Sequence, residues 1–197
     1  AQTRIDTGHR MPILAAAEEQ VKAGDQPIVP SRMWDRSAVP LDENIEVGSG
    51  LLPHRQNINA ILEIEVGDVG GEEDGVKHGG SNEALYTTVA DVAKAVEALG
   101  LGDKGRYISA LTFGNVHGVY KPGGVKLRPE LLGEIQAGIA AQFGTDAKPL
   151  DLVFHGGSGS PEDEIATAVR NGVGKMHIDT DTQYASTRSP SEERRVG

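Results

Sequence analysis

Runs of hydrophobic residues alternate along the chain with segments whose hydrophobic positions recur at helical spacing. Five of these runs have the near-continuous hydrophobicity of strands that are buried on both faces. They are Gln26–Met33, Ala60–Val66, Arg106–Phe113, Leu150–Phe154 and Gly174–Ile178. Because helical segments separate them, the pattern predicts βα units, with a parallel sheet and crossover helices in a single α/β domain.

Residues that favour helix ends mark the boundaries of four predicted helices. These are Leu14–Lys22, which ends at Gly24; Val89–Leu99, with Thr88 and Asp91 as a capping box; Pro129–Phe143, which closes at Gly144; and a helix with Ser160, Pro161 and Asp163 in its cap and first turn, which ends near Gly172.

Two segments depart from this alternation. Gly48, Gly50 and Pro53 fall within the crossover helix expected from Asp42, and they predict that this helix is broken there. The last residues, Ser186–Gly197, are polar and mixed in charge, so we expect a disordered tail after an ordered domain over residues 1–185.

Composition narrows the class of protein. The 197 residues are 38% hydrophobic and 24% charged, which is typical of a soluble globular chain. No hydrophobic run approaches the roughly 18 residues of a membrane span, and the first ten residues lack a signal-peptide core. We therefore expect a cytoplasmic protein without a membrane partner. A net charge of −10 argues against binding to nucleic acid.

The absence of cysteine excludes disulfides, thiolate catalysis and cysteine-ligated zinc. Any metal must then be held by histidine, aspartate or glutamate. Groups of these types lie near the ends of the five predicted strands: Asp35, Glu65, His117, His155 and Asp179. The carboxyl ends of parallel strands share one face, and two imidazoles with a carboxylate suit zinc or a similar divalent ion. The pattern therefore predicts a metal site.

Some of these groups have simpler structural interpretations. His117 could be a buried histidine satisfied by a carbonyl, and Asp35 an ordinary cap or turn residue. Glu63 and Glu65 fall within one predicted strand, and we expect one of the two to face inward, where a carboxylate needs a charged partner or a metal.

Three loops carry further candidate chemistry. Gly156–Ser160 precedes a helix, and its N–H groups with the hydroxyls of Ser158 and Ser160 predict a phosphate site; a flexible turn with a serine cap is the alternative. His177–Thr182 suits a polyol, or is a simple turn. Gly70–Gly75 is either a solvated acidic run or a mobile loop that carries a carboxylate base.

Four motifs together resemble those of the class II, metal-dependent fructose-bisphosphate aldolases. They are LEIEVG with GGEEDG from Leu62, FGNVHGVYKPG from Phe113, VFHGGSGS from Val153 and DTDTQ from Asp179, and they occur in the order of that family. The resemblance implies a TIM (β/α)8 barrel, of which this chain carries about five βα units, strands 4–8. We accordingly expect a fragment without the N-terminal barrel strands and the C-terminal region.

The resemblance implies roles for particular residues. His117 and His155 would hold the catalytic Zn²⁺, and Asp35 and Glu65 a second divalent metal or a monovalent cation. Glu73 and Asp179 would be catalytic, with Glu73 as the loop carboxylate that moves the substrate proton. The substrate-binding residues would be Gly118, Lys121, Gly156, Gly157, Ser158, His177, Ile178, Asp179 and Thr180.

The implied activity is the reversible aldol cleavage of fructose 1,6-bisphosphate, in glycolysis and gluconeogenesis, by a homodimer or higher homo-oligomer that binds small sugar phosphates. Alternatives are a tagatose- or sedoheptulose-bisphosphate aldolase or an inactive sugar-phosphate-binding fragment; the residues without the resemblance also allow a metallohydrolase barrel. The chain departs from the family at two positions. The third zinc histidine of the family would lie before Ala1, which predicts weak zinc binding, and His177 stands where the family has an asparagine that contacts the substrate, which favours the inactive alternative.

Overall fold

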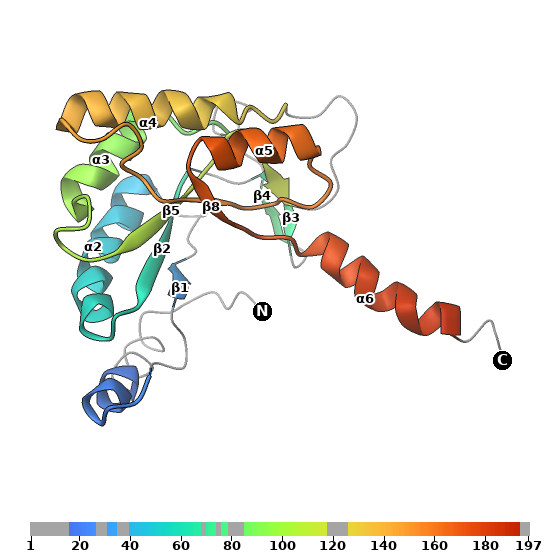
Figure 1. Ribbon diagram of the computed structural model, residues 1–197, viewed down its shortest axis with the longest axis horizontal. Coiled ribbons are helices and arrows are strands. Elements are labelled where there is room, and N and C mark those ends of the chain that lie inside the picture. The colour runs from blue at the N-terminus through green and yellow to red at the C-terminus, as the bar shows by residue number, and fades with distance from the viewer. Residues whose placement is uncertain are drawn as a thin grey trace.

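A computed structural model describes residues 16–26, 31–34, 40–67, 70–73, 76–78, 85–117 and 126–193. For residues 31–34, 70–73, 76–78, 117 and 188–193 the description covers the backbone alone. The main sheet has five parallel strands in the order β1-β2-β5-β7-β8 (Figure 1). They are β1 (Ser31–Trp34), β2 (Ile61–Val66), β5 (Tyr107–Leu111), β7 (Leu152–Phe154) and β8 (Val173–Met176). The predicted parallel sheet is confirmed, and its strands lie in chain order, as successive βα units require.

Helices connect these strands and cover one face of the sheet, packing side by side in chain order (Figure 1). They are α2 (Leu41–Asn57), α3 (Val89–Leu99), α4 (Glu130–Phe143) and α5 (Glu162–Arg170), and a further helix spans residues 16–22. The hydrophobic core lies between this layer and the sheet. Leu62, Ile64 and Val66 alternate along β2 and are at most 3% exposed, and they pack in the same core cluster as Leu52 and Leu99 of the helices. Since strand side chains alternate in direction, the residues between them face the other side of the sheet.

Two of the predicted helix boundaries are confirmed and one is wrong. Thr88 and Asp91 form the predicted capping box of α3, and Gly144 closes α4 in the left-handed conformation. Ser160, however, is not the cap of α5; Pro161 holds that position, and the buried Ser160 hydroxyl forms no hydrogen bond with any described group. A proline at the cap supplies the extended backbone that starts the helix without a side-chain acceptor.

The predicted break at Gly48–Pro53 is wrong, because α2 continues without interruption through all three of the residues that were expected to end it. Tertiary packing outweighs their low helix propensity. Gly48 is buried against the sheet, where a Cβ would lie 3.7 Å from Ile64 and 3.8 Å from Leu99. Leu51 and Leu52, which lie between Gly50 and Pro53, are both buried in the core and hold the helix in place.

A second, three-stranded sheet was not predicted. It has the order β4-β3-β6, formed by β3 (Gly70–Glu73), β4 (Val76–His78) and β6 (Val116–His117). The expected loop over Gly70–Gly75 is therefore partly a strand, which its glycine-rich, acidic sequence disfavours. His117 lies in this second sheet, where it pairs with Gly71, and not directly at the end of β5.

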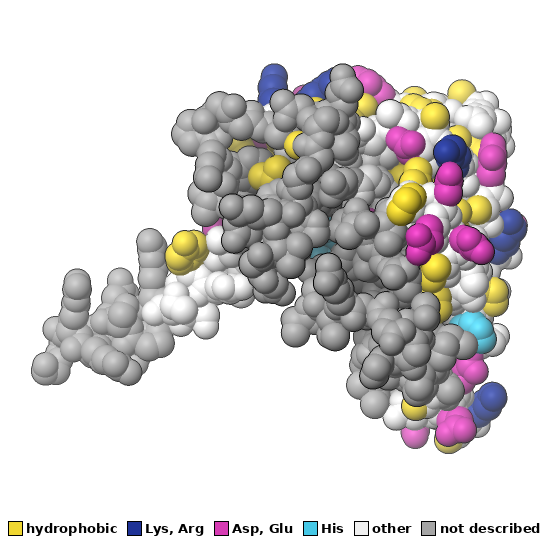
Figure 2. Space-filling view, turned by 180° about the vertical axis from the view of Figure 1, so that it is seen from behind, with side chains coloured by type: hydrophobic (Ala, Val, Ile, Leu, Met, Phe, Trp, Pro, Cys, Tyr) yellow, Lys and Arg dark blue, Asp and Glu magenta, His cyan; other side chains and the backbone are white. Residues whose placement is uncertain are grey.

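The predicted disordered tail from Ser186 is wrong for all of its described residues, 186–193, because α6 (Thr180–Glu193) extends through them. Helical hydrogen bonds are local, so a polar segment can form them without a hydrophobic face; the backbone N–H of Gln183, for example, donates to the carbonyl of Asp179. The helix projects away from the body of the molecule (Figure 1). Of the described helices, none has the length and hydrophobicity to cross a membrane. Figure 2 shows acidic and basic side chains interspersed over the described part of one face.

Candidate metal centre

The two glutamates of β2 both lie on the face of the sheet opposite the core helices. Glu63 is 0% and Glu65 is 3% exposed. Only one of them was expected to face inward, and this was wrong because residues two positions apart on a strand point to the same side. Next to Glu65 in the sheet lie Ala110 of β5 and then Val153 of β7. These smaller side chains leave space above the sheet for a third, longer one.

His155 fills that space. It follows β7 directly, is 1% exposed, and lies between the two carboxylates. Its Nε2 is 2.8 Å from Oε1 of Glu63, and its Nδ1 is 2.9 Å from Oε1 of Glu65. Ionised carboxylates only accept hydrogen bonds, so this arrangement favours the doubly protonated ring. Burial alone would lower the pKa of His155, but the hydrogen bonds to Glu63 and Glu65 outweigh it and raise the pKa to about 9.

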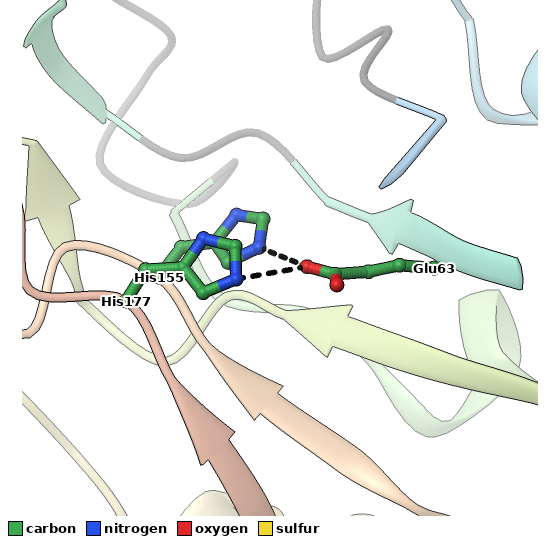
Figure 3. A group of neighbouring side chains, drawn as sticks. All are labelled: Glu63, His155 and His177. Atoms are coloured by element: carbon green, nitrogen blue, oxygen red, sulfur yellow. Dashed lines mark hydrogen bonds and ion pairs between the residues drawn. The ribbon is translucent and has the colours of Figure 1, made fainter. Parts of the chain in front are cut away.

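His177 completes a three-residue cluster around one oxygen atom. It follows β8, and its Nε2 lies 3.3 Å from the same Oε1 of Glu63 that His155 contacts (Figure 3). The two imidazole rings are stacked, with centroids 4.4 Å apart. Lys175 of β8 contacts the other oxygen of Glu63, with Nζ 2.5 Å from Oε2.

Neighbouring charges also shift the pKa values of Glu63 and His177. At Glu63 they act against the effect of burial, and at His177 the charge of His155 acts in the same direction as burial. Burial would raise the pKa of Glu63, but hydrogen bonds from His155 and Lys175 outweigh this and lower the pKa to about 2. For His177, burial and the positive charge of His155 together lower the pKa to about 4. Glu63 is therefore a carboxylate and His177 a neutral imidazole at neutral pH, and both are the forms that bind metal ions.

The donor atoms of these three residues fit a divalent metal ion. One ligand atom from each of Glu63, His155 and His177 lies within 4.8 Å of the others. Two imidazole nitrogens with a carboxylate oxygen suit zinc and neighbouring first-row metals. Glu65 contacts the second ring nitrogen of His155, an arrangement that commonly orients metal-binding histidines.

The structure thus brings together three of the predicted residues, Glu65, His155 and His177. It adds Glu63 and Lys175, neither of which was predicted as a site residue. The alternation of Glu63 and Glu65 on one strand contained the information, because residues i and i+2 share a face. Lys175 could have been found by the same rule, since it lies two residues before His177.

The other predicted site residues are only partly described. Asp35, Gly118 and Lys121 lie outside the described residues, and of His117 and Glu73 the structure describes the backbone. The segment that leads to His117 is nevertheless tied to the cluster, because the buried Asn115 donates its amide to the carbonyl of His155 at 3.0 Å. The ligand role of His117 stays a prediction.

The glycine-rich turn after His155 makes several of its hydrogen bonds internally. Gly157 donates its N–H to the carbonyl of His177, and Gly159 donates to the carboxylate of Asp181 at 3.1 Å. The Ser158 hydroxyl, in turn, accepts from the backbone N–H of Asp181. A carboxylate of the chain itself therefore contacts the turn that was predicted to hold a phosphate.

The remaining predicted residues lie on the solvent side of the cluster. Asp179 is exposed, and its carboxylate accepts a hydrogen bond from Gln183, one turn into α6. Ile178 is 44% exposed, and Thr180 is the first residue of α6. The catalytic role predicted for Asp179 and the substrate contacts of its neighbours stay predictions.

Comparison with known proteins decides between the families that this site allows. The model of the family described as "Fructose-bisphosphate aldolase class-II" matches residues 7–195. The chain belongs to the class II fructose-bisphosphate aldolase family. Curated fructose-bisphosphate aldolases of Streptomyces coelicolor and Mycobacterium tuberculosis are 58% and 56% identical to it, over 92% and 90% of this chain and 53% and 52% of their own lengths. It thus spans about half the length of these curated relatives.

Solved structures agree with this assignment to the class II aldolases. A crystal structure of the fructose-bisphosphate aldolase of Campylobacter jejuni matches with a TM-score of 0.71 at 44% identity, covering 88% of this chain and 48% of that one. The fold is therefore that of the class II aldolase TIM barrel, and the five parallel strands are part of it. Metal dependence is general in this family, and the cluster around Glu63 is a candidate metal site.

The shifted pKa values predict how the stability of this class II aldolase chain, freed of metal, depends on pH. The contribution of His155 is complete below its unfolded pKa of 6.5 and is lost as the pH rises through about 9. The contribution of His177 is complete above 6.5 and is lost as the pH falls through about 4, and that of Glu63 is complete above 4.5 and is lost through about 2. The contribution of the site is therefore expected to be greatest near pH 6.5.

Urea unfolding midpoints measured from pH 3 to pH 9.5 in the presence of EDTA check this expectation. The variant His177→Gln is the matched control, because it should lose much of the decline between pH 6.5 and pH 4.5 and keep the decline above pH 6.5. A midpoint that stays constant between pH 6.5 and pH 9 in the unsubstituted protein would contradict the positive charge assigned to His155.

Proposed function

We propose that this protein catalyses the reversible, zinc-dependent aldol cleavage of fructose 1,6-bisphosphate to dihydroxyacetone phosphate and glyceraldehyde 3-phosphate. The observation that carries the proposal is the convergence of Glu63, His155 and His177 in a chain whose family match extends over residues 7–195. The sequence motifs around these residues are the ones expected of such an enzyme. The high identity to curated fructose-bisphosphate aldolases supports this substrate over tagatose or sedoheptulose bisphosphate.

In this proposal His155, with His117, would hold the zinc ion; the family resemblance further implies a second cation position at Asp35 and Glu65. When bound, zinc supplies a Lewis acid that polarises the ketone carbonyl of the substrate. In the condensation direction Glu73 takes the proton from the carbon next to the carbonyl of dihydroxyacetone phosphate, and in the cleavage direction it returns a proton to that carbon. Asp179 is the second catalytic residue. A carboxylate suits the role of Glu73, because it can hold the proton in one direction of the reaction and return it in the other.

The substrate-binding residues that we propose share loops next to the carboxyl ends of strands. They are Gly118, Lys121, Gly156, Gly157, Ser158, His177, Ile178, Asp179 and Thr180. Since Gly159 already donates to Asp181, a phosphate on this turn would displace the Asp181 carboxylate, one anion replacing another. We further propose that the active form is a cytoplasmic homodimer or higher homo-oligomer.

Cleavage of fructose 1,6-bisphosphate by the purified chain, with and without EDTA, tests the proposed reaction. We expect a cleavage rate that falls by about 1,000-fold or more when the metal is removed, since Lewis-acid stabilisation is worth several kcal/mol. Addition of Zn²⁺ should restore the rate. Tagatose 1,6-bisphosphate and sedoheptulose 1,7-bisphosphate, assayed in parallel, should be cleaved more slowly.

Two results would count against this function. Cleavage that is unaffected by EDTA would contradict the metal dependence. Binding of dihydroxyacetone phosphate without any cleavage, by protein whose folding is confirmed by circular dichroism and whose metal content is measured, would instead support a sugar-phosphate-binding role.

A further inference from the structure

We propose that His177 is itself a metal ligand, so that the ion is held by Nε2 of His155, Nε2 of His177 and Oε1 of Glu63, while Glu65 positions His155 from behind. This inference deepens the proposed function, on whose metal dependence it rests, by naming the ligands of the same site. It departs from what the family resemblance implies at two residues: His177 binds the metal and does not only contact substrate, and Glu65 positions His155 and does not hold a second cation. The ligand role of His117 stays a prediction.

The geometry of the three donor atoms is the first argument. They come from separate parts of the chain, β2 and the segments after β7 and β8, yet both imidazole Nε2 atoms approach one oxygen of Glu63 (Figure 3). The two nitrogen–oxygen distances are 2.8 and 3.3 Å. Ligands about 2.0–2.1 Å from a tetrahedral zinc ion are about 3.3 Å apart. Both nitrogen–oxygen distances are therefore close to those in a zinc site, and all three donor atoms lie within 4.8 Å of one another.

The environment of Glu63 determines which of its oxygens is available. Lys175 contacts Oε2, whereas both histidines contact Oε1. The lysine thus holds the carboxylate in an orientation that presents Oε1 toward the two rings. We therefore expect Glu63 to bind the ion through one oxygen.

Glu65 determines which nitrogen of His155 is available. Its carboxylate lies 2.9 Å from Nδ1 and keeps a proton on that nitrogen, so the proton released when a metal ion binds is the one on Nε2, which then becomes the metal-binding nitrogen. Nε2 is the atom that contacts Glu63, and the ring that carries it is stacked on the ring of His177. Glu65 is therefore assigned as a positioning residue.

The position and exposure of His177 distinguish a metal site from a simple buried ion pair as the interpretation of this cluster. The ion pair is complete with His155 between its two carboxylates, and it gives no reason for a second imidazole at the same oxygen. The side chain of His177 is 35% exposed, in contrast to 1% for His155. The cluster is thus closed on the side of His155 and open on the side of His177, as in metal sites that leave a position for water or substrate.

The test is metal binding by the purified chain, measured by Zn²⁺ competition with a chromophoric chelator and by the visible absorption of bound Co²⁺. We expect His177→Gln to weaken Zn²⁺ affinity by about 100-fold and to alter the Co²⁺ spectrum, because a ligand is lost. Glu65→Gln should weaken affinity by about 10- to 100-fold with the same number of imidazole ligands. X-ray absorption should count one imidazole fewer in His177→Gln than in the unsubstituted chain.

His54→Gln is the matched control. His54 on α2 is 41% exposed and lies 3.2 Å from Glu18, so it is a comparable histidine–carboxylate contact away from the cluster. Zn²⁺ affinity should not change in this variant. His177→Asn provides a second substitution at the same position, and circular dichroism of the metal-free variants confirms that each one folds.

Unchanged affinity and an unchanged Co²⁺ spectrum in folded His177→Gln and His177→Asn would overturn the assignment of His177. This result is distinguishable from failure of the proposed function. Tight binding that depends on His177, in a chain that does not cleave the bisphosphate, would support the ligand set and contradict the aldolase activity.

Discussion

Replacement of His155 by leucine is expected to destabilise the metal-free protein by about 3 to 5 kcal/mol, because it leaves two buried carboxylates without the positive charge between them. Glu63 and Glu65 are at most 3% exposed, so water cannot take the place of the imidazole. Leucine has a similar volume, so the loss reports charge and hydrogen bonding more than packing. Urea unfolding at pH 6.5 in the presence of EDTA measures the difference in free energy of unfolding.

The double variant His155→Leu/Glu65→Gln separates the electrostatic part of this loss from the rest. Removing one of the two negative charges should recover part of the stability, although Glu65→Gln on its own should be destabilising. A loss below about 1 kcal/mol in His155→Leu would show that the carboxylates are not held by this residue, and the metal-free site would then need a different account.

The parts of the fold that the sequence predicts are those set by local chemistry. The capping box of Thr88 and Asp91, and Gly144 at the end of α4, act within a single turn of helix. The strands of the main sheet are recognisable because both of their faces are covered, which requires near-continuous hydrophobic residues. The strands predicted at Ala60–Val66, Arg106–Phe113 and Leu150–Phe154 nevertheless extend beyond β2, β5 and β7, since hydrophobic residues continue past the last ladder hydrogen bond.

The errors share a different cause, which is packing between distant segments. Pro53 remains within α2 because Leu51 and Leu52 are buried in the core, and no local pattern reports that burial. The strand β3 is stabilised by its pairing with β4 and β6, and the glycine-rich, acidic sequence of this segment does not predict that pairing. In each case tertiary contacts override local propensity.

The metal centre lies between these two cases. His155 could be identified from its place after a buried strand and before a glycine-rich turn. Its direct contact with Glu63 could not be predicted, because Glu63 lies 92 positions away in the sequence and contacts His155 across β5. The contact of His177 with Glu63 likewise joins residues 114 positions apart in the sequence, from strands that are separated in the sheet by β5 and β7.

The turn at Gly114 helps to position the residues of this metal centre. Gly114 follows Phe113 with φ +90° and donates its N–H to the carbonyl of Leu85. The turn that it allows lets the next residue, Asn115, accept from Phe113 N–H and donate to the carbonyl of His155. The positions of His155 and of the strand that carries His117 therefore both depend on this turn.

Substitution of Gly114 by alanine is accordingly expected to destabilise the protein by about 3 to 5 kcal/mol, through backbone strain and overpacking together. An added Cβ would lie 2.1 Å from the carbonyl oxygen of Lys126, and backbone atoms have no rotamer that relieves such a contact. Zn²⁺ affinity should fall as well, because the Asn115 contact moves with the turn. Urea unfolding and chelator competition measure the two effects.

Gly144→Ala is the control that isolates the steric part. Gly144 also has a positive φ, +66°, but a Cβ there would meet no atom within 4 Å. This variant should lose only about 1 kcal/mol, from the conformational cost of a left-handed alanine, and should bind Zn²⁺ normally. If the two substitutions were equally mild, the close approach of Lys126 to the turn would not constrain the site, and His155 would have to be held by its two carboxylates alone.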